Sequence, residues 1–204
     1  MLNANTPDVV SEHVTSLFDL FQAQGDGAYI GESISQLEHS LQAAHFAAED
    51  NAPPTTIIAA LLHDVGQFIP HSEAADMLDE HGASVGRRSH DKLGAEYLRS
   101  HGWPESVYKL VGAHVEAKRY LAMDQEYEQS LSRASQASLR AQGGKFTQEQ
   151  KAAFEQDPLW SEKVRLRTYD DRSKVVGLQV PDLSAYRSMA EDILRSEGTL
   201  RERL

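Results

Sequence analysis

The stretch from Ala59 to Gly66 constrains this chain most, because it joins a strongly apolar run to an adjacent histidine and aspartate. Four apolar residues lead directly into His63 and Asp64. Such a run favours burial, and a carboxylate beside it is costly to bury unless it is paired or binds a metal. We therefore expect other parts of the chain to supply partners for this His-Asp pair.

Further histidines recur at intervals that suit a common site. The candidate ligands are His39, His63, Asp64, His90, His114 and either Asp170 or Asp171. The histidines are spaced by 24, 27 and 24 residues (39 to 63, 63 to 90, 90 to 114). Each interval fits one helix and one connection, so successive antiparallel helices can bring their ends to one centre.

This set of ligands is too large for one zinc ion, which usually takes four. It suits two ions, with Asp64 shared between them. Because the chain contains no cysteine, iron, manganese and zinc are all compatible with the remaining imidazole and carboxylate donors. The other histidines are predicted not to be ligands: His13, His45, His71, His81 and His101.

Hydrophobic periodicity predicts an all-α fold with a single domain over residues 1–204, which is long enough to bury a substantial core. Helices are expected over 7–24, 32–50, 56–63, 90–101, 105–123, 125–141, 147–154, 159–174 and 183–197. Residues 67–86 are acidic and rich in turn-forming residues, and we expect a loop with a short helix there. No segment shows the alternation typical of a strand.

The net charge of −11 argues against a nucleic-acid partner, which would require a basic face. No apolar run approaches the ~20 residues that cross a bilayer, and residues 1–8 lack the apolar core of a signal peptide. We therefore expect a cytoplasmic protein without a membrane partner. A few local Lys and Arg residues can still form a pocket for a small anion.

The order His, His-Asp, His, His, Asp resembles the HD-domain superfamily and implies a helical bundle. The similarity extends to the mixed-valent diiron oxygenases that cleave 1-hydroxy-organophosphonates, which are relatives of myo-inositol oxygenase. It rests on Tyr29-x-x-Glu32 before the first histidine, Lys118 four residues after the last, and a terminal Asp-Asp-x-x-Lys over 170–174. It covers about residues 29–175, in the segments 29–42, 59–66, 90–95, 114–120, 135–144 and 167–174.

This resemblance implies two iron ions, Fe(II) and Fe(III), with Asp64 as the bridge. The implied ligands are His39, His63, Asp64, His90, His114 and Asp170. Asp170 is favoured over Asp171 by its place three residues after Arg167. Tyr29 and Glu32 are implied to guard the iron and respond to substrate, with Glu32 facing a substrate amine. They would share one face if their segment is helical; the alternative is a surface Tyr and Glu.

The phosphonate of such a substrate calls for cations and hydrogen-bond donors. Lys118 lies one helical turn after His114, and Arg167 precedes the last ligand, so both suit a phosphonate dianion. Ser135, Ser138 and Gln142 fall on one face of a helix, either facing phosphonate oxygens or exposed to solvent.

Gln67, four residues after His63, stands where related oxygenases usually carry a basic side chain. It is predicted to contact the substrate by hydrogen bonding. Its lack of charge, with Glu32 as a cation partner, favours (R)-1-hydroxy-2-(trimethylamino)ethylphosphonate over 2-amino-1-hydroxyethylphosphonate. Aromatic rings could form a cation–π pocket for that group.

The expected activity is iron- and O2-dependent cleavage of the C–P bond of this small-molecule organophosphonate, giving glycine betaine and phosphate. The primary-amine substrate would give glycine instead. Two alternatives differ in class. One is an HD phosphohydrolase in which the metal activates water; the other is a non-catalytic, HD-like ligand-binding module.

Overall fold

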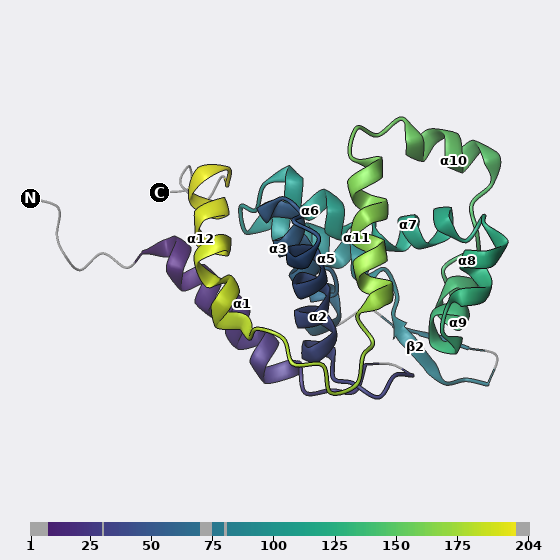
Figure 1. Ribbon diagram of the computed structural model, residues 1–204, viewed down its shortest axis with the longest axis horizontal. Helices are drawn as coiled ribbons and strands as arrows, with labels where there is room; N and C mark the ends of the chain where they lie inside the picture. Colours follow the sequence, from purple (N-terminus) through teal and green to yellow (C-terminus); the bar gives the residue numbers. More distant parts are fainter. Residues whose placement is uncertain (1–7, 30, 70–74, 80, 199–204) are drawn as a thin grey trace, which may run out of the picture.

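The computed structural model describes residues 8–29, 31–69, 75–79 and 81–198, and it confirms a mostly helical chain (Figure 1). The helices are α1 (Val9–Gln24), α2 (Gln36–Glu49), α3 (Pro54–Leu62), α4 (Val65–Phe68), α5 (His90–Ser100), α6 (Glu105–Val111), α7 (His114–Leu121), α8 (Gln125–Ser130), α9 (Arg133–Ala141), α10 (Gln148–Glu155), α11 (Trp160–Arg172) and α12 (Arg187–Ser196), with a 3-10 turn at Leu183–Tyr186. None of the helices among these residues is both long and apolar enough to cross a membrane.

Helix α3 lies at the centre of the core, as its apolar sequence predicts. Pro54 occupies its first position, where a missing N–H costs nothing, and every residue from Thr56 to Leu62 is buried. It packs mainly on α2 and α6 and also contacts α11 and α12. Figure 1 shows α1 and α12 on one side of this centre and α7 to α10 on the other. The burial of α3 therefore fixes the end that carries His63.

Helix α2 begins later than the expected 32–50 because a capping box sets its start. The Ser35 hydroxyl accepts from the Glu38 amide, and the Ser35 amide donates to the Glu38 carboxylate. The preceding residues form a tight turn in which the Tyr29 amide donates to the Ile34 carbonyl. The segment with Tyr29 and Glu32 is therefore a turn, and a shared helical face for this pair is wrong.

Where the structure describes the range 67–86, it contains a small antiparallel hairpin instead of the expected loop with a short helix; residues 70–74 and 80 lie outside the described residues. Its strands are β1 (Asp76–Leu78) and β2 (Ser84–Arg87), paired at Asp76 with Arg87 and at Leu78 with Ser84, with an irregularity between. Helix α4 ends at Phe68. These strands are too short to show a strand period, and Gly86 has a φ of 107°, which favours glycine.

Two long predicted helices are each divided in the structure. The 105–123 helix breaks into α6 and α7 at Gly112, whose carbonyl accepts from Lys92 Nζ instead of a helical N–H. The 125–141 helix breaks at Leu131, which is extended, and Ser132 caps α9 by accepting from the Ser135 amide. Both breaks matter for function, because α7 starts at His114 and α9 starts just before Ser135.

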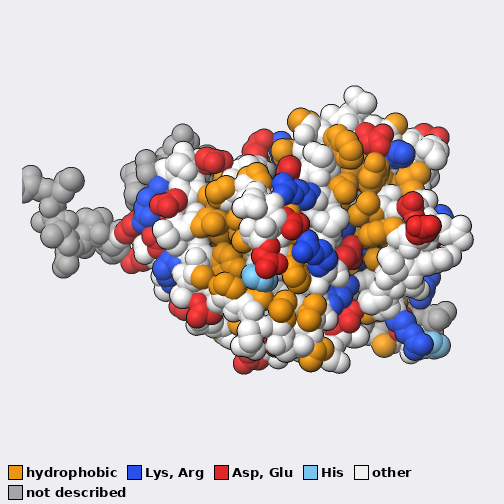
Figure 2. Space-filling model, viewed as in Figure 1, with side chains coloured by type: hydrophobic (Ala, Val, Ile, Leu, Met, Phe, Trp, Pro, Cys, Tyr) orange, Lys and Arg blue, Asp and Glu red, His pale blue; other side chains and the backbone are white. Residues whose placement is uncertain are grey.

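The face shown in Figure 2 carries Lys and Arg intermixed with Asp and Glu, between patches of hydrophobic side chains. This mixed face differs from the continuous basic surface that binds nucleic acid.

Candidate metal centre

The structure brings the six candidate ligands together at or near the ends of six helices. His39 lies on α2 and Asp170 on α11, while His90 and His114 are the first residues of α5 and α7. His63 ends α3 and Asp64 precedes α4. All six are at most 6% exposed. They form two groups with ligand atoms within 4.8 Å of one another: His39, His63 and Asp170, and Asp64, His90 and His114.

Each of the four imidazoles is held in the same tautomer by a backbone carbonyl. The Nδ1 atoms lie at hydrogen-bond distance from Ser173 O for His39 (2.7 Å), Ala60 O for His63 (2.8 Å), Arg87 O for His90 (3.0 Å) and Val111 O for His114 (2.8 Å). A carbonyl can only accept, so each Nδ1 carries a proton, and in its neutral form, the form that binds a metal, each ring turns an Nε2 lone pair inward.

These inward lone pairs face one another in pairs. The Nε2 atoms of His39 and His63 are 3.0 Å apart, as are those of His90 and His114. Two neutral rings with Nδ1 protonated cannot hydrogen-bond through Nε2, whereas a shared metal ion satisfies both. Within the described chain, the buried Oδ1 atom of Asp170 also has no hydrogen-bond donor. The donor set therefore fits metal ions.

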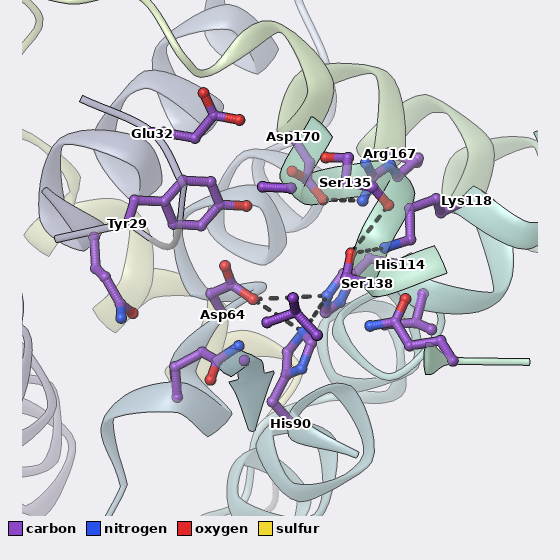
Figure 3. A pocket seen from close by; sticks show the side chains of 17 residues that line it. Tyr29, Glu32, Asp64, His90, His114, Lys118, Ser135, Ser138, Arg167 and Asp170 are labelled. Carbon is purple, nitrogen blue, oxygen red and sulfur yellow. Dashed lines mark hydrogen bonds and ion pairs between the residues drawn. The ribbon is translucent and has the colours of Figure 1, made fainter. Parts of the chain in front are cut away.

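Asp64 lies between the two groups. Its Oδ1 is 3.2 Å from His90 Nε2 (Figure 3), and its Oδ2 is 3.5 Å from His63 Nε2. Burial opposes ionisation, but the electrostatic influence of His63 and His90 outweighs it and holds the pKa of Asp64 well below its usual range. An ionised carboxylate with one oxygen toward each group has the arrangement of a bridging ligand.

The two late aspartates take different positions. Asp170 Oδ1 is 3.4 Å from His39 Nε2, and its other oxygen accepts from Arg167 Nη1 at 2.6 Å. Asp171 instead pairs with Arg167 and accepts from the Tyr127 hydroxyl. The structure thus places Asp170, and not Asp171, among the candidate ligands.

The close contact between α4 and α5 depends on Gly66. A Cβ at this position would lie 1.9 Å from the His90 carbonyl oxygen. The absence of a side chain therefore lets α4, which follows Asp64, lie directly against the start of α5.

A narrow cavity of about 60 Å³ opens beside this centre. Every residue predicted to be catalytic or to bind substrate lines it: Tyr29, Glu32, Gln67, Lys118, Ser135, Ser138, Gln142 and Arg167. In Figure 3, Tyr29 and Glu32 lie on one side and Lys118, Ser138 and Arg167 on the other, with Asp64 and Asp170 between them.

Tyr29 stacks on His39, with ring centroids 3.8 Å apart. Burial of its hydroxyl and the charges of Asp170 and Asp64 raise the pKa of Tyr29 well above its usual value, so the phenol stays protonated. One buried oxygen of Glu32, Oε1, receives no hydrogen bond from the residues that the structure describes.

The opposite side is cationic. Lys118 Nζ donates to Ser138 Oγ at 2.8 Å, and burial, followed by the charge of Arg167, lowers the pKa of Lys118 to about 7. Gln142 Oε1 is buried and has no hydrogen-bond partner in the described ranges. These groups can bind the oxygens of an anion.

Two residues predicted to contact the substrate already make hydrogen bonds to other residues of the protein. The Arg167 guanidinium donates to Asp170 through Nη1 and to Asp171 through Nε and Nη2. Gln67 accepts from the Arg87 amide through Oε1 at 3.1 Å. Arg167 therefore offers the pocket mainly its charge, and Gln67 offers its amide NH2.

Some lining residues were missed by the sequence reasoning. Gln36 is three residues before His39, so helical spacing could have found it. Val85 and Gly86 come from β2, and no sequence signal predicted that strand. Lys174 was noted as part of a motif, but its contact with Ser135 across 39 residues was not foreseen.

The remaining histidines lie outside both ligand groups where the structure describes them. His45 pairs with Glu49, and His13 stacks on His101. His81 also belongs to neither group, and His71 lies outside the described residues.

Comparisons with known proteins agree with this geometry. The profile of the HD domain matches residues 37–143. The chain is 44% identical over 186 residues to the hydroxymethylphosphonate dioxygenase of Gimesia maris, covering 90% of this chain and 89% of that one. It is 35% identical over 173 residues to the [1-hydroxy-2-(trimethylamino)ethyl]phosphonate dioxygenase (glycine-betaine-forming) of Leisingera caerulea, covering 84% and 85%. An uncharacterized protein of Acanthamoeba polyphaga mimivirus is 35% identical over 196 residues, covering 96% and 87%. The chain belongs to the HD-domain family, in the group of phosphonate dioxygenases that two of these relatives represent.

Proposed function

We propose that this protein is an iron- and O2-dependent oxygenase that cleaves the C–P bond of a 1-hydroxyphosphonate. The observation that carries this proposal is the pair of ligand groups with inward Nε2 atoms and Asp64 between them. The cationic side of the adjoining cavity supports an anionic substrate. In the overall reaction, one 1-hydroxyphosphonate and one O2 give one carboxylic acid and one phosphate.

One iron would be held by His39, His63 and Asp170, and the other by His90 and His114, with Asp64 shared. When bound, this pair supplies O2 chemistry and Lewis acidity toward the substrate. The chain itself orients the substrate: Lys118, Ser138 and Gln142 bind phosphonate oxygens, and Arg167 adds positive charge. Tyr29 covers His39 and keeps its proton.

The first candidate substrate is (R)-1-hydroxy-2-(trimethylamino)ethylphosphonate, which would give glycine betaine and phosphate. Its support is the carboxylate of Glu32, whose buried Oε1 has no hydrogen-bond donor in the described structure and would attract a substrate cation in competition with Lys174, 4.0 Å away. The neutral Gln67 adds no competing positive charge. The Leisingera caerulea relative carries this substrate in its name.

Hydroxymethylphosphonate is the second candidate, because the cavity is narrow and Tyr29 is the one aromatic residue in its described lining. Quaternary ammonium groups are usually enclosed by several aromatic rings. The Gimesia maris relative is named for this substrate.

Anaerobic loading with iron, followed by phosphate assays with and without O2, tests the proposal. The substrates are these two compounds and 2-amino-1-hydroxyethylphosphonate. Phosphate release that requires O2 is the expected result. Release that persists without O2 would identify a phosphohydrolase. No release from any of the three, with fewer than two irons bound per chain, would favour a ligand-binding module.

A further inference from the structure

The segment that follows α11 is attached to α2 at two points. Ser173 O accepts from His39 Nδ1. The side-chain amide of Gln42 both donates to Val175 O (2.8 Å) and accepts from the Val175 amide (3.0 Å). The backbone of Lys174 is therefore fixed on both sides, and its side chain leaves from a defined position.

That side chain is 13% exposed and contacts two residues that line the cavity, Ser135 and Glu32. Lys174 Nζ donates to Ser135 Oγ at 2.9 Å and lies 4.0 Å from Glu32 Oε1. The Glu32 side chain is itself only 18% exposed. Lys174 thus gives its hydrogen bond to the serine and only its charge to the glutamate.

We propose that Lys174 is a specificity-determining residue that sets the charge preference of the Glu32 end of the cavity. This inference rests on the proposed function. A positive charge 4 Å from a poorly solvated carboxylate offsets much of that carboxylate's attraction for any other cation. A substrate ammonium or trimethylammonium group near Glu32 must therefore compete with Lys174.

The consequence concerns the group at C2 of the substrate. With Lys174 present, the Glu32 end is close to electrically balanced, and a substrate without a cation, such as hydroxymethylphosphonate, leaves no buried charge unpaired. Without Lys174, Glu32 would be a buried anion that requires a partner. Removal of this lysine should therefore shift preference toward the cationic substrates.

The test compares specificity ratios in the iron-loaded, full-length protein. The first ratio is kcat/KM for hydroxymethylphosphonate divided by kcat/KM for the trimethylammonium substrate. The second ratio has the primary-amine substrate in the denominator instead. In Lys174→Met each ratio should fall by about tenfold or more, because one missing charge at 4 Å is worth at least that factor. Lys174→Arg, which keeps the charge, should stay near the wild-type ratio. Lys145→Met removes an exposed lysine paired with Glu128 and is the matched control.

A double-mutant cycle with Glu32→Gln gives a second measurement. In the Glu32→Gln background, Lys174→Met should no longer change the ratio, because the carboxylate that it balances is absent. Anaerobic calorimetric titration with the same three compounds should show the same shift in binding alone. Lys174→Gln replaces Lys174→Met if the latter does not fold.

The outcomes separate the two proposals. If the wild type releases phosphate but Lys174→Met lowers activity toward all three substrates equally, the specificity role is overturned and Lys174 only supports Ser135. A ratio that rises also overturns it. If the wild type releases no phosphate from any of the three, the proposed function falls, and this inference falls with it.

Discussion

Two groups of histidines in this molecule use the same side chain in different ways. In the candidate metal centre, each ring donates Nδ1–H to a carbonyl and turns Nε2 toward a carboxylate and a second imidazole. Near the start of α1 and the end of α5, His13 stacks on His101 with centroids 5.1 Å apart, and His13 Nε2 accepts from Trp103 Nε1 at 3.0 Å. Among the described residues, no carboxylate is at ion-pair distance from either of these rings.

The difference shows what makes a histidine available to a metal. Burial is shared, since His13 is partly buried, and burial followed by its neighbour His101 lowers its pKa to about 4. What His13 lacks is a free Nε2, because Trp103 occupies it. The four central rings have Nδ1 fixed by the backbone and Nε2 left for a ligand.

The largest effect should come from His63→Ala, which removes one central ring. Iron affinity should fall by more than about 100-fold, since loss of even an outer partner of a ligand costs 10–100-fold, and O2-dependent phosphate release should be lost. Iron per chain after anaerobic loading and desalting measures this. His13→Gln is the control variant. Circular dichroism of both variants checks that each one folds. If His63→Ala retained two irons, His63 would not be needed to bind metal. The central histidines would then not differ from His13 and His101 in this respect.

Next in size is the contrast between Asp170→Asn and Asp171→Asn. The first should lose one of the two irons, because Asp170 faces His39. The second should keep both irons but raise KM about tenfold, because a charge-assisted partner of Arg167 is lost. Iron content and steady-state kinetics together decide this. If Asp171→Asn loses iron and Asp170→Asn does not, the assignment of the last ligand is reversed.

A smaller effect concerns pH and the cationic side of the cavity. The pKa of Lys118 is lowered to about 7, so its charge disappears as the pH rises above that value. KM for a phosphonate should therefore rise severalfold between about pH 7 and 9 in the wild type. Lys118→Arg stays charged and should have a flatter profile. Parallel profiles for the two proteins would contradict a charge role for Lys118.

The smallest effect belongs to His13. Its pKa is about 4 in the folded protein and ordinarily 6.5, so the unfolded chain binds the proton more readily. Its stabilising contribution is complete above about pH 6.5 and is lost as the pH falls toward 4. Urea unfolding should show about 1 kcal/mol of this dependence, given the screening of a partly exposed ring. His13→Gln should remove that part of the slope, and an unchanged slope would exclude His13 as its source.

The positions that the sequence predicts well are those tied to helix ends. His63, His90 and His114 each end or begin a helix, so their spacing along the chain is enough to place them near one another. The nearly all-apolar sequence of α3 likewise predicts that this helix is buried. These features depend on local sequence patterns, which a single chain displays.

The features that the sequence could not predict depend on contacts between distant segments. The β hairpin has strands of three and four residues, too short to show an alternating pattern. At the break near Gly112, the Gly112 carbonyl accepts from Lys92 on another helix. Lys174 reaches Ser135 and Glu32 only because Gln42, 133 residues away along the chain, holds Val175. Such contacts exist only once the core has assembled.

Gly66 gives this centre an unusual mutational sensitivity. Its backbone lies so close to the His90 carbonyl that even alanine would push α4 and α5 apart. Asp64 precedes α4 and His90 begins α5, so this displacement would change the distance between the candidate bridge and one of its neighbours. A scan restricted to ligands and substrate contacts would overlook this position. Yet Gly66, which would contact neither ion, would control the spacing of a two-ion centre, because it has a hydrogen atom where other residues have a Cβ.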